Sequence, residues 1–183
     1  GRFHALKAAA NRSISLIGLH DASADRATQI AAEVSAPALA PEAVIAAAEA
    51  VIIAAPTRFH YSLAAQALSA GRHVFIEKPI AASLDQADRL IALAARQGRV
   101  LQVGHIERFS AAFRTVMATP SGGRALSFDA VRAAPFRPRS LDVSVVLDLM
   151  IHDLDLVMEL AGGEPEAVEA VGAAIASEHP DFA

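Results

Sequence analysis

Three aspartates and a histidine occur within eight residues of the sequence, in the stretch "DLMIHDLD" at 148–155. Such a set could bind a metal ion, form an acid/base pair, or make the solvated face of a helix. Asp148 and His152 are four residues apart, so a helix would place both side chains on one face. The carboxylate could then orient the imidazole, which can accept a proton near neutral pH.

A metal site is the first alternative, because "HD" followed by a further aspartate resembles part of the ligand set of HD-type phosphohydrolases. Those sites need additional histidines at helical positions, and the remaining histidines of this chain belong to other segments. The sequence contains no cysteine, which excludes a Cys-ligated zinc and a thiolate nucleophile. We therefore expect no metal.

Other polar groups follow the predicted strands of the first half. Asp21, the loop "PTRFH" at 56–60 and "EKP" at 77–79 each stand where a strand ends. In an open parallel sheet, ligands bind beyond these carboxyl ends, and an acidic residue there accepts hydrogen bonds from the adenosine ribose. Asp21 follows Gly1 by roughly the twenty residues that separate a glycine loop from this acid, so Gly1 could be the last glycine of a GxGxxG motif. This interpretation favours NAD over NADP, because a carboxylate repels a 2′-phosphate.

The elements that must position these groups alternate along the first half, as in a parallel α/β sheet. Helices are predicted over 4–10, 23–34, 59–71 and 83–98, and strands over 13–19, 48–56, 72–79 and 99–104. Ser83 with Gln86 predicts a capping box, and Gly71 and Gly98 predict helix ends. We expect residues 1–103 to form a Rossmann-type domain without its first strand.

The pattern changes after Gly104. A helix is predicted over 144–163, and alternating segments at 125–133 and 167–176 are typical of half-exposed strands. We expect residues 104–183 to form an incomplete α+β domain with a mixed or antiparallel open sheet, serving substrate binding and oligomerisation.

The composition of the chain limits the classes of partner that it could bind. The net charge of −4 provides no basic field for nucleic acid, and no apolar run approaches the ~18 residues that would span a membrane. The absence of cysteine suits a reducing compartment, so we expect a cytoplasmic protein with neither a nucleic-acid nor a membrane partner.

Five stretches resemble the Gfo/Idh/MocA family, the glucose-fructose oxidoreductase and inositol dehydrogenase class of NAD(P)-dependent enzymes. They occur in the family's order and span nearly the whole chain: "GRFHA" (1–5), "AAPTRFH" (54–60), "AGRHVFIEKPIA" (70–81), "VGHIERF" (103–109) and "LDLMIHDLDLV" (147–157). The complete first strand, its glycine loop and a larger C-terminal sheet of the family are not among these residues.

The resemblance implies a Rossmann domain and a second α/β domain whose open sheet supports homodimers or homotetramers. It implies that Lys78 lies near the nicotinamide and the reacting hydroxyl, and that Asp148 and His152 face it from the second domain. The cofactor would be held by residues at the strand ends and the glycine loop: Gly1, Asp21, Pro56, Thr57, His60, Glu77, Lys78 and Pro79.

These residues suit the oxidation of a secondary alcohol by hydride transfer. His152 could take the hydroxyl proton, and the Lys78 cation could hold the substrate oxygen while negative charge builds on it. The alternatives are a surface lysine before proline, an Asp/His pair on a helix surface and a solvated Asp21. His60 could equally serve as a cap or face solvent, and Glu77 could be structural.

The loop "PFRPRS" at 135–140 bears on the substrate, because it resembles the branch of the family that includes bacterial UDP-N-acetylglucosamine 3-dehydrogenases. Arg137 and Arg139 could bind a pyrophosphate, or be solvated. His105 and Arg108 could also reach a substrate. We expect NAD-dependent oxidation of a sugar or sugar nucleotide to a ketone. The alternatives are an inositol or free-sugar dehydrogenase, and a non-catalytic NAD-binding sensor.

Overall fold

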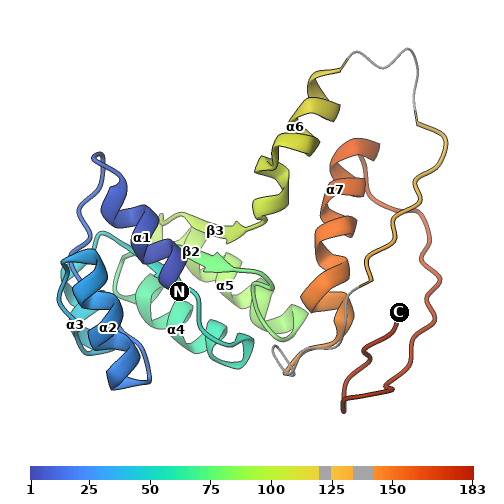
Figure 1. Cartoon of the computed structure of the whole chain (residues 1–183). Helices are drawn as coiled ribbons and strands as arrows, with labels where there is room; N and C mark the ends of the chain where they lie inside the picture. Colours follow the sequence, from blue (N-terminus) through green and yellow to red (C-terminus); the bar gives the residue numbers. More distant parts are fainter. Residues whose placement is uncertain (120–124, 134–141) are drawn as a thin grey trace. The chain divides into compact units, whose positions relative to one another are not determined.

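The structure is a computed structural model that describes residues 1–119, 125–133 and 142–183. The chain divides into two compact units, Gly1–Val103 and Gly104–Ala183 (Figure 1). Arg137 and Arg139 lie outside the described residues, so nothing in the structure bears on their proposed role.

A three-stranded sheet organises the first unit. Its strands are β1 (Ala50–Ile53), β2 (His73–Glu77) and β3 (Leu101–Gly104), in the order β1-β2-β3. Strands β1 and β2 are parallel, with Ala50 opposite His73 and Ile53 opposite Ile76. The predicted Rossmann-type parallel sheet is thereby confirmed, with strands shorter than the apolar segments that predicted them.

Helices accompany the sheet in the order expected of a parallel α/β unit. They are α1 (Arg2–Ala10), α2 (Ala24–Val34), α3 (Pro41–Ala47), α4 (His60–Ser69) and α5 (Leu84–Gln97), with a 3-10 turn at Thr57–Phe59 before α4. Val74 and Ile76 of β2 are buried in the core with Leu68 of α4 and Leu90 of α5. Strand side chains alternate between faces, so Phe75 points the other way, where its ring meets the edge of His4 of α1.

The predicted helix ends are confirmed. The Ser83 hydroxyl accepts a hydrogen bond from the Gln86 amide at 3.3 Å, and the Gln86 side chain accepts one from the Ala82 amide. Gly71 and Gly98 have φ of +73° and +60°, the left-handed conformation that glycine adopts without strain.

Two predictions for the first unit are wrong. Residues 13–19 form no strand, because only Leu19 pairs, in a single parallel bridge with Ala38. Their apolar side chains are partly open to solvent, with Ile14 53% exposed. Conversely, the segment expected to be a loop around Pro41 contains helix α3, in which Pro41 takes the first helical position that suits its fixed φ.

The regular elements in the described part of the second unit are helices and helical turns. It contains a 3-10 turn at Ile106–Phe109, α6 (Ala111–Ala118), a π-helical turn at Val146–Met150 and α7 (Ile151–Ala161). The strands predicted over 125–133 and 167–176 are not seen, since the described residues there form no ladder beyond an isolated antiparallel bridge between Ala173 and Phe182. A strand exists only through a hydrogen-bonded partner, which local alternation cannot supply. In the described ranges, no helix has the length and apolarity to cross a membrane.

Candidate active site

Lys78 directly follows strand β2, as its sequence position predicted. It is half-buried, and its peptide bond to Pro79 is cis. The turn after β1 contains Pro56 and the buried Thr57, and it lies at the same edge of the sheet because β1 and β2 are parallel. The turns that contain Pro56, Thr57 and Lys78 therefore lie at one edge of the sheet.

His60 connects the two turns at this edge. Its ring is 1% exposed; Nδ1 lies 2.7 Å from the carbonyl oxygen of Pro79, and Nε2 lies 2.8 Å from that of Ala55. The alternative of a solvent-facing His60 is therefore wrong. The histidine instead bridges backbone carbonyls that follow two different strands.

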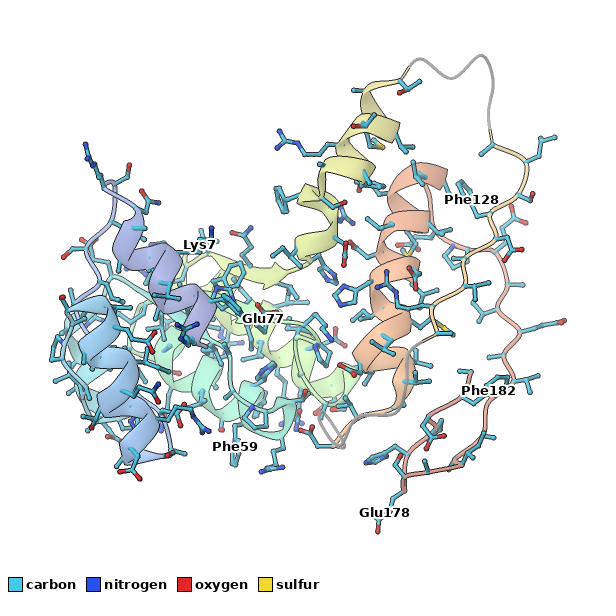
Figure 2. All side chains as sticks on the ribbon, viewed as in Figure 1. Lys7, Phe59, Glu77, Phe128, Glu178 and Phe182 are labelled. Carbon is cyan, nitrogen blue, oxygen red and sulfur yellow. The ribbon has the colours of Figure 1, made fainter. Side chains whose placement is uncertain are left out.

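Glu77 is bound by a residue that the sequence reasoning missed. His4 Nε2 of α1 lies 2.5 Å from Glu77 Oε1, and both side chains are about one-third exposed. Glu77 is labelled in Figure 2. The two residues are 73 positions apart, so no local spacing could have paired them. This contact links the helix that begins at Gly1 to the strand that ends before Lys78.

Asp21 is held more firmly than a solvated turn residue would be. Its carboxylate accepts two hydrogen bonds from Arg26, at 2.7 and 2.6 Å, and one from the Ser23 amide at 2.9 Å. The Arg26 guanidinium lowers the pKa of the Asp21 carboxyl below its usual value, against the opposing effect of burial. Asp21 is therefore ionised at neutral pH. Arg26 bonds both of its oxygens, and its role toward the ribose stays a prediction.

Asp148 and His152 stand on either side of a change in helix type. Asp148 lies within the π-helical turn, and His152 is the second residue of α7, so the helix predicted over 144–163 is confirmed but opens with a π-helical turn that the sequence did not predict. Short π-helical turns interrupt α-helices frequently at functional sites. Both residues are half-buried, and their proposed roles remain predictions.

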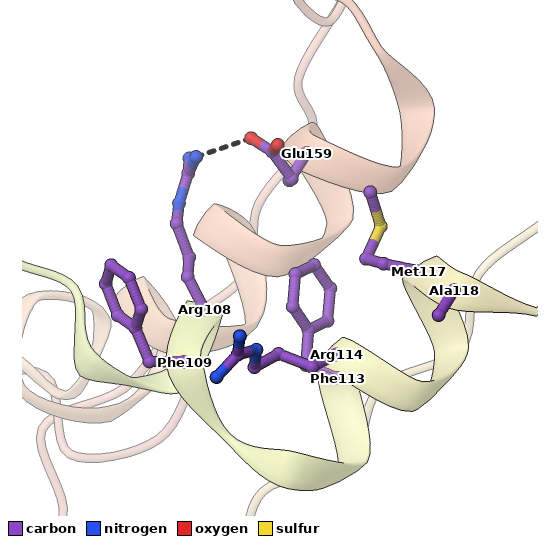
Figure 3. A pocket seen from close by; sticks show the side chains of 7 residues that line it. All are labelled: Arg108, Phe109, Phe113, Arg114, Met117, Ala118 and Glu159. Atoms are coloured by element: carbon purple, nitrogen blue, oxygen red, sulfur yellow. Dashed lines mark hydrogen bonds and ion pairs between the residues drawn. The ribbon is translucent and has the colours of Figure 1, made fainter.

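Arg108 contacts carboxylates on α7. It donates to both Asp155 oxygens, at 2.8 and 2.7 Å, and also bonds Glu159 (Figure 3). His105 Nδ1 lies 3.7 Å from Asp155. Burial is the largest single effect on Asp155 and would raise its pKa. The Arg108 hydrogen bonds and the nearby charges of Arg108, His105 and His152 together outweigh burial, so the pKa lies below its usual value. The substrate-binding roles of His105 and Arg108 stay predictions. Arg108 would have to bind the substrate while its guanidinium is bonded to Asp155 and Glu159.

A pocket of about 500 Å³ opens beside Arg108, within the second unit. Figure 3 shows its lining, which is mostly apolar: Arg108, Phe109, Phe113, Arg114, Met117, Ala118 and Glu159. None of Lys78, Asp148 and His152 lines it.

Asp153 pairs with an arginine of the same unit. Its two oxygens accept hydrogen bonds from Arg132, both at 2.8 Å, and this pairing lowers the pKa of Asp153. Across the described residues, no three His, Asp or Glu side chains are grouped as metal ligands.

Comparison with known proteins yields relatives over the whole chain. The chain is 43% identical, over 184 residues, to UDP-N-acetylglucosamine 3-dehydrogenase of Acidithiobacillus ferrooxidans, and this match covers 100% of the chain but 58% of the relative. It is 31% identical to myo-inositol dehydrogenase Hyg17 of Streptomyces leeuwenhoekii over 94% of the chain and 55% of that relative. The chain thus spans less than two thirds of the length of these relatives.

The solved structures agree with the sequence matches. A structure of the Acidithiobacillus ferrooxidans enzyme superposes with a TM-score of 0.87 at 42% identity, covering 98% of this chain and 59% of that one. Residues 1–105 also match a family model described as an oxidoreductase family with an NAD-binding Rossmann fold. The chain therefore belongs to the Gfo/Idh/MocA oxidoreductase family.

Proposed function

We propose that this chain is part of an NAD-dependent dehydrogenase that oxidises a secondary hydroxyl of a sugar nucleotide to a ketone, with UDP-N-acetylglucosamine as its first candidate substrate. The observation that carries the proposal is the 43% identity to UDP-N-acetylglucosamine 3-dehydrogenase, which extends through both units. A match confined to the Rossmann unit would have supported cofactor binding alone, because fold does not specify substrate.

The residues of the first unit fit NAD. Asp21 is ionised and sits in the turn that precedes α2, where a dinucleotide-binding unit has its ribose-binding acid. Gly1 precedes α1, and the N-terminus of such a helix suits the pyrophosphate of a dinucleotide. The Asp21 carboxylate suits a ribose whose hydroxyls donate to it.

The reaction breaks the O–H and the carbinol C–H bonds of the substrate. Bound NAD would supply the acceptor for the hydride. We assign the hydroxyl proton to His152, the orientation of His152 to Asp148, and the hydrogen bond that holds the substrate oxygen to Lys78. Arg139 and Arg137 would hold the pyrophosphate of a sugar nucleotide.

The proposal is tested by incubating the intact protein with NAD and a panel of UDP-N-acetylhexosamines, inositols and free sugars. We expect NADH to form with the highest kcat/KM on UDP-N-acetylglucosamine, and more slowly with NADP in place of NAD. If no compound of the panel leads to NADH, the proposal is overturned and a non-catalytic NAD-binding sensor is favoured.

Myo-inositol oxidation is the second candidate. It is favoured by the 31% identity to myo-inositol dehydrogenase Hyg17 over 94% of the chain. A higher kcat/KM on myo-inositol than on the nucleotide sugars would select it.

We also propose a cytoplasmic homodimer or homotetramer that assembles through the second unit. Val168, Val171 and Ile175 are each at least 75% exposed in a segment whose alternation predicted a strand. Apolar side chains left open in this way are typical of an interaction surface. The molar mass of the intact protein in solution, measured by light scattering, distinguishes these assemblies from a monomer.

A further inference from the structure

Two histidines from different helices hold the residues on either side of Lys78. His4 of α1 bonds the side chain of Glu77, and His60 of α4 bonds the backbone carbonyl of Pro79. Lysine carries its ammonium on a flexible four-carbon stem. The direction in which that stem leaves the backbone is therefore set by how its two neighbours are fixed.

His60 makes its contacts in the interior of the first unit. The ring is almost fully buried, and both of its nitrogens face carbonyl oxygens, which only accept hydrogen bonds. The second of these carbonyls, that of Ala55, belongs to the turn after β1. His60 thus ties the turn that follows β2 to the turn that follows β1.

The His4 contact ties the same short segment to a third element. His4 lies in the first turn of α1, and its ring also meets the edge of Phe75 at a centroid distance of 5.5 Å. Phe75 and Glu77 are two residues apart on β2, so both point to the face on which α1 lies. These two contacts fix the end of β2 relative to α1, the helix that begins after Gly1.

We propose that His4 and His60 are positioning residues that fix Glu77 and Pro79, and thereby aim Lys78 at the substrate hydroxyl. The inference rests on the role proposed above for Lys78. It predicts that loss of either contact lowers the rate of the chemical step more than it weakens NAD binding, because a misplaced group affects the transition state most.

The test uses paired variants of the intact protein. His4→Phe keeps the ring contact with Phe75 but cannot donate to Glu77, whereas His4→Gln restores a donor. We expect His4→Phe to lower kcat by about 10- to 100-fold, with KM for NAD changed by less than about threefold, and His4→Gln to recover most of the loss. His60→Leu should behave like His4→Phe if it folds, and the half-exposed His4 carries the test if it does not.

His73→Phe is the matched control. His73 opens the same strand, and its Nδ1 accepts a hydrogen bond from the Val100 amide at 3.0 Å. Like His4→Phe, this control removes one histidine hydrogen bond from β2, but at the end of the strand remote from Lys78. The kcat of His73→Phe should therefore stay near the wild-type value. An equal fall in kcat in His73→Phe and His4→Phe, or no fall in His4→Phe, contradicts the proposal.

A second readout does not depend on turnover. Reductive methylation with carbon-13 formaldehyde labels the lysine side chains of the protein, which include Lys7 and Lys78, and the Lys78 signal is assigned as the one lost in Lys78→Arg. We expect this signal to shift or broaden in His4→Phe and not in His73→Phe. An unchanged signal refutes the positioning role, whereas an inactive wild type with the expected NMR changes refutes only the proposed function.

Discussion

Arginines bind the two aspartates that follow His152 on helix α7. Asp153 is bound by Arg132 and Asp155 by Arg108, in each case through both oxygens, and both carboxyl groups have lowered pKa values. A carboxylate that is stabilised in its ionised form is a poor proton acceptor near neutral pH. This supports the assignment of the substrate proton to His152 rather than to either aspartate.

The Asp155 to Arg108 pair gives a prediction for stability. The Asp155 side chain is 11% exposed and that of Arg108 is 38% exposed. Replacing Arg108 by methionine leaves a largely buried carboxylate without its donor, and we expect a loss of about 1–2 kcal/mol in the free energy of unfolding at pH 7. Urea unfolding of the intact protein measures this difference.

The pH dependence of that loss has a defined sign. Because the pKa of Asp155 is lowered in the folded protein, the pair stabilises it fully at pH values above the ordinary carboxyl pKa of 3.8. The contribution disappears as the pH falls through the folded pKa. The wild type and Arg108→Met should therefore differ equally at pH 6 and pH 8, and converge below about pH 4; a constant difference into acid would exclude this pair as the cause.

At the scale of elements, the sequence predicted the helix ends, which depend on residues within one turn. Ser83 and Gly98 marked both ends of α5 correctly, since a capping hydroxyl and a left-handed glycine act within one turn. The segment 13–19 failed as a strand, because strand formation depends on a partner elsewhere in the chain. The π-helical turn at Asp148 was likewise not predictable, because the residue types of Val146–Met150 do not distinguish a π-helix from an α-helix.

The cap of α5 can be tested alone. Ser83→Ala removes the acceptor of the Gln86 amide and should lower the free energy of unfolding by about 1 kcal/mol. Ser15→Ala, at an exposed serine outside the helices, is the matched control and should change it little. Equal effects of the two substitutions would show that the cap is not what stabilises the start of α5.

At the scale of the whole molecule, the candidate catalytic groups are divided between the two units. Lys78 belongs to Gly1–Val103, and Asp148 and His152 belong to Gly104–Ala183. The assignment of the chemistry to these residues comes from the sequence order and the family resemblance, and it stays a prediction. The ion pairs of Arg108 and Arg132 with α7, and the contact of His4 with Glu77, join residues 21 to 73 positions apart, and no spacing rule reaches that far.

The division of the site between two units gives the prediction that tests it as one site. In the intact protein, Lys78→Met and His152→Ala should each lower kcat by about 10²–10⁴ while NAD still binds. If both groups act on the same hydroxyl, the double variant should lose scarcely more than the worse single variant, because groups that act as a unit are strongly non-additive. His179→Ala, an exposed histidine of the second unit, is the control and should leave kcat unchanged. Multiplicative losses in the double variant would instead mean that Lys78 and His152 act in separate steps, and Lys78 would then be a cofactor-binding residue alone.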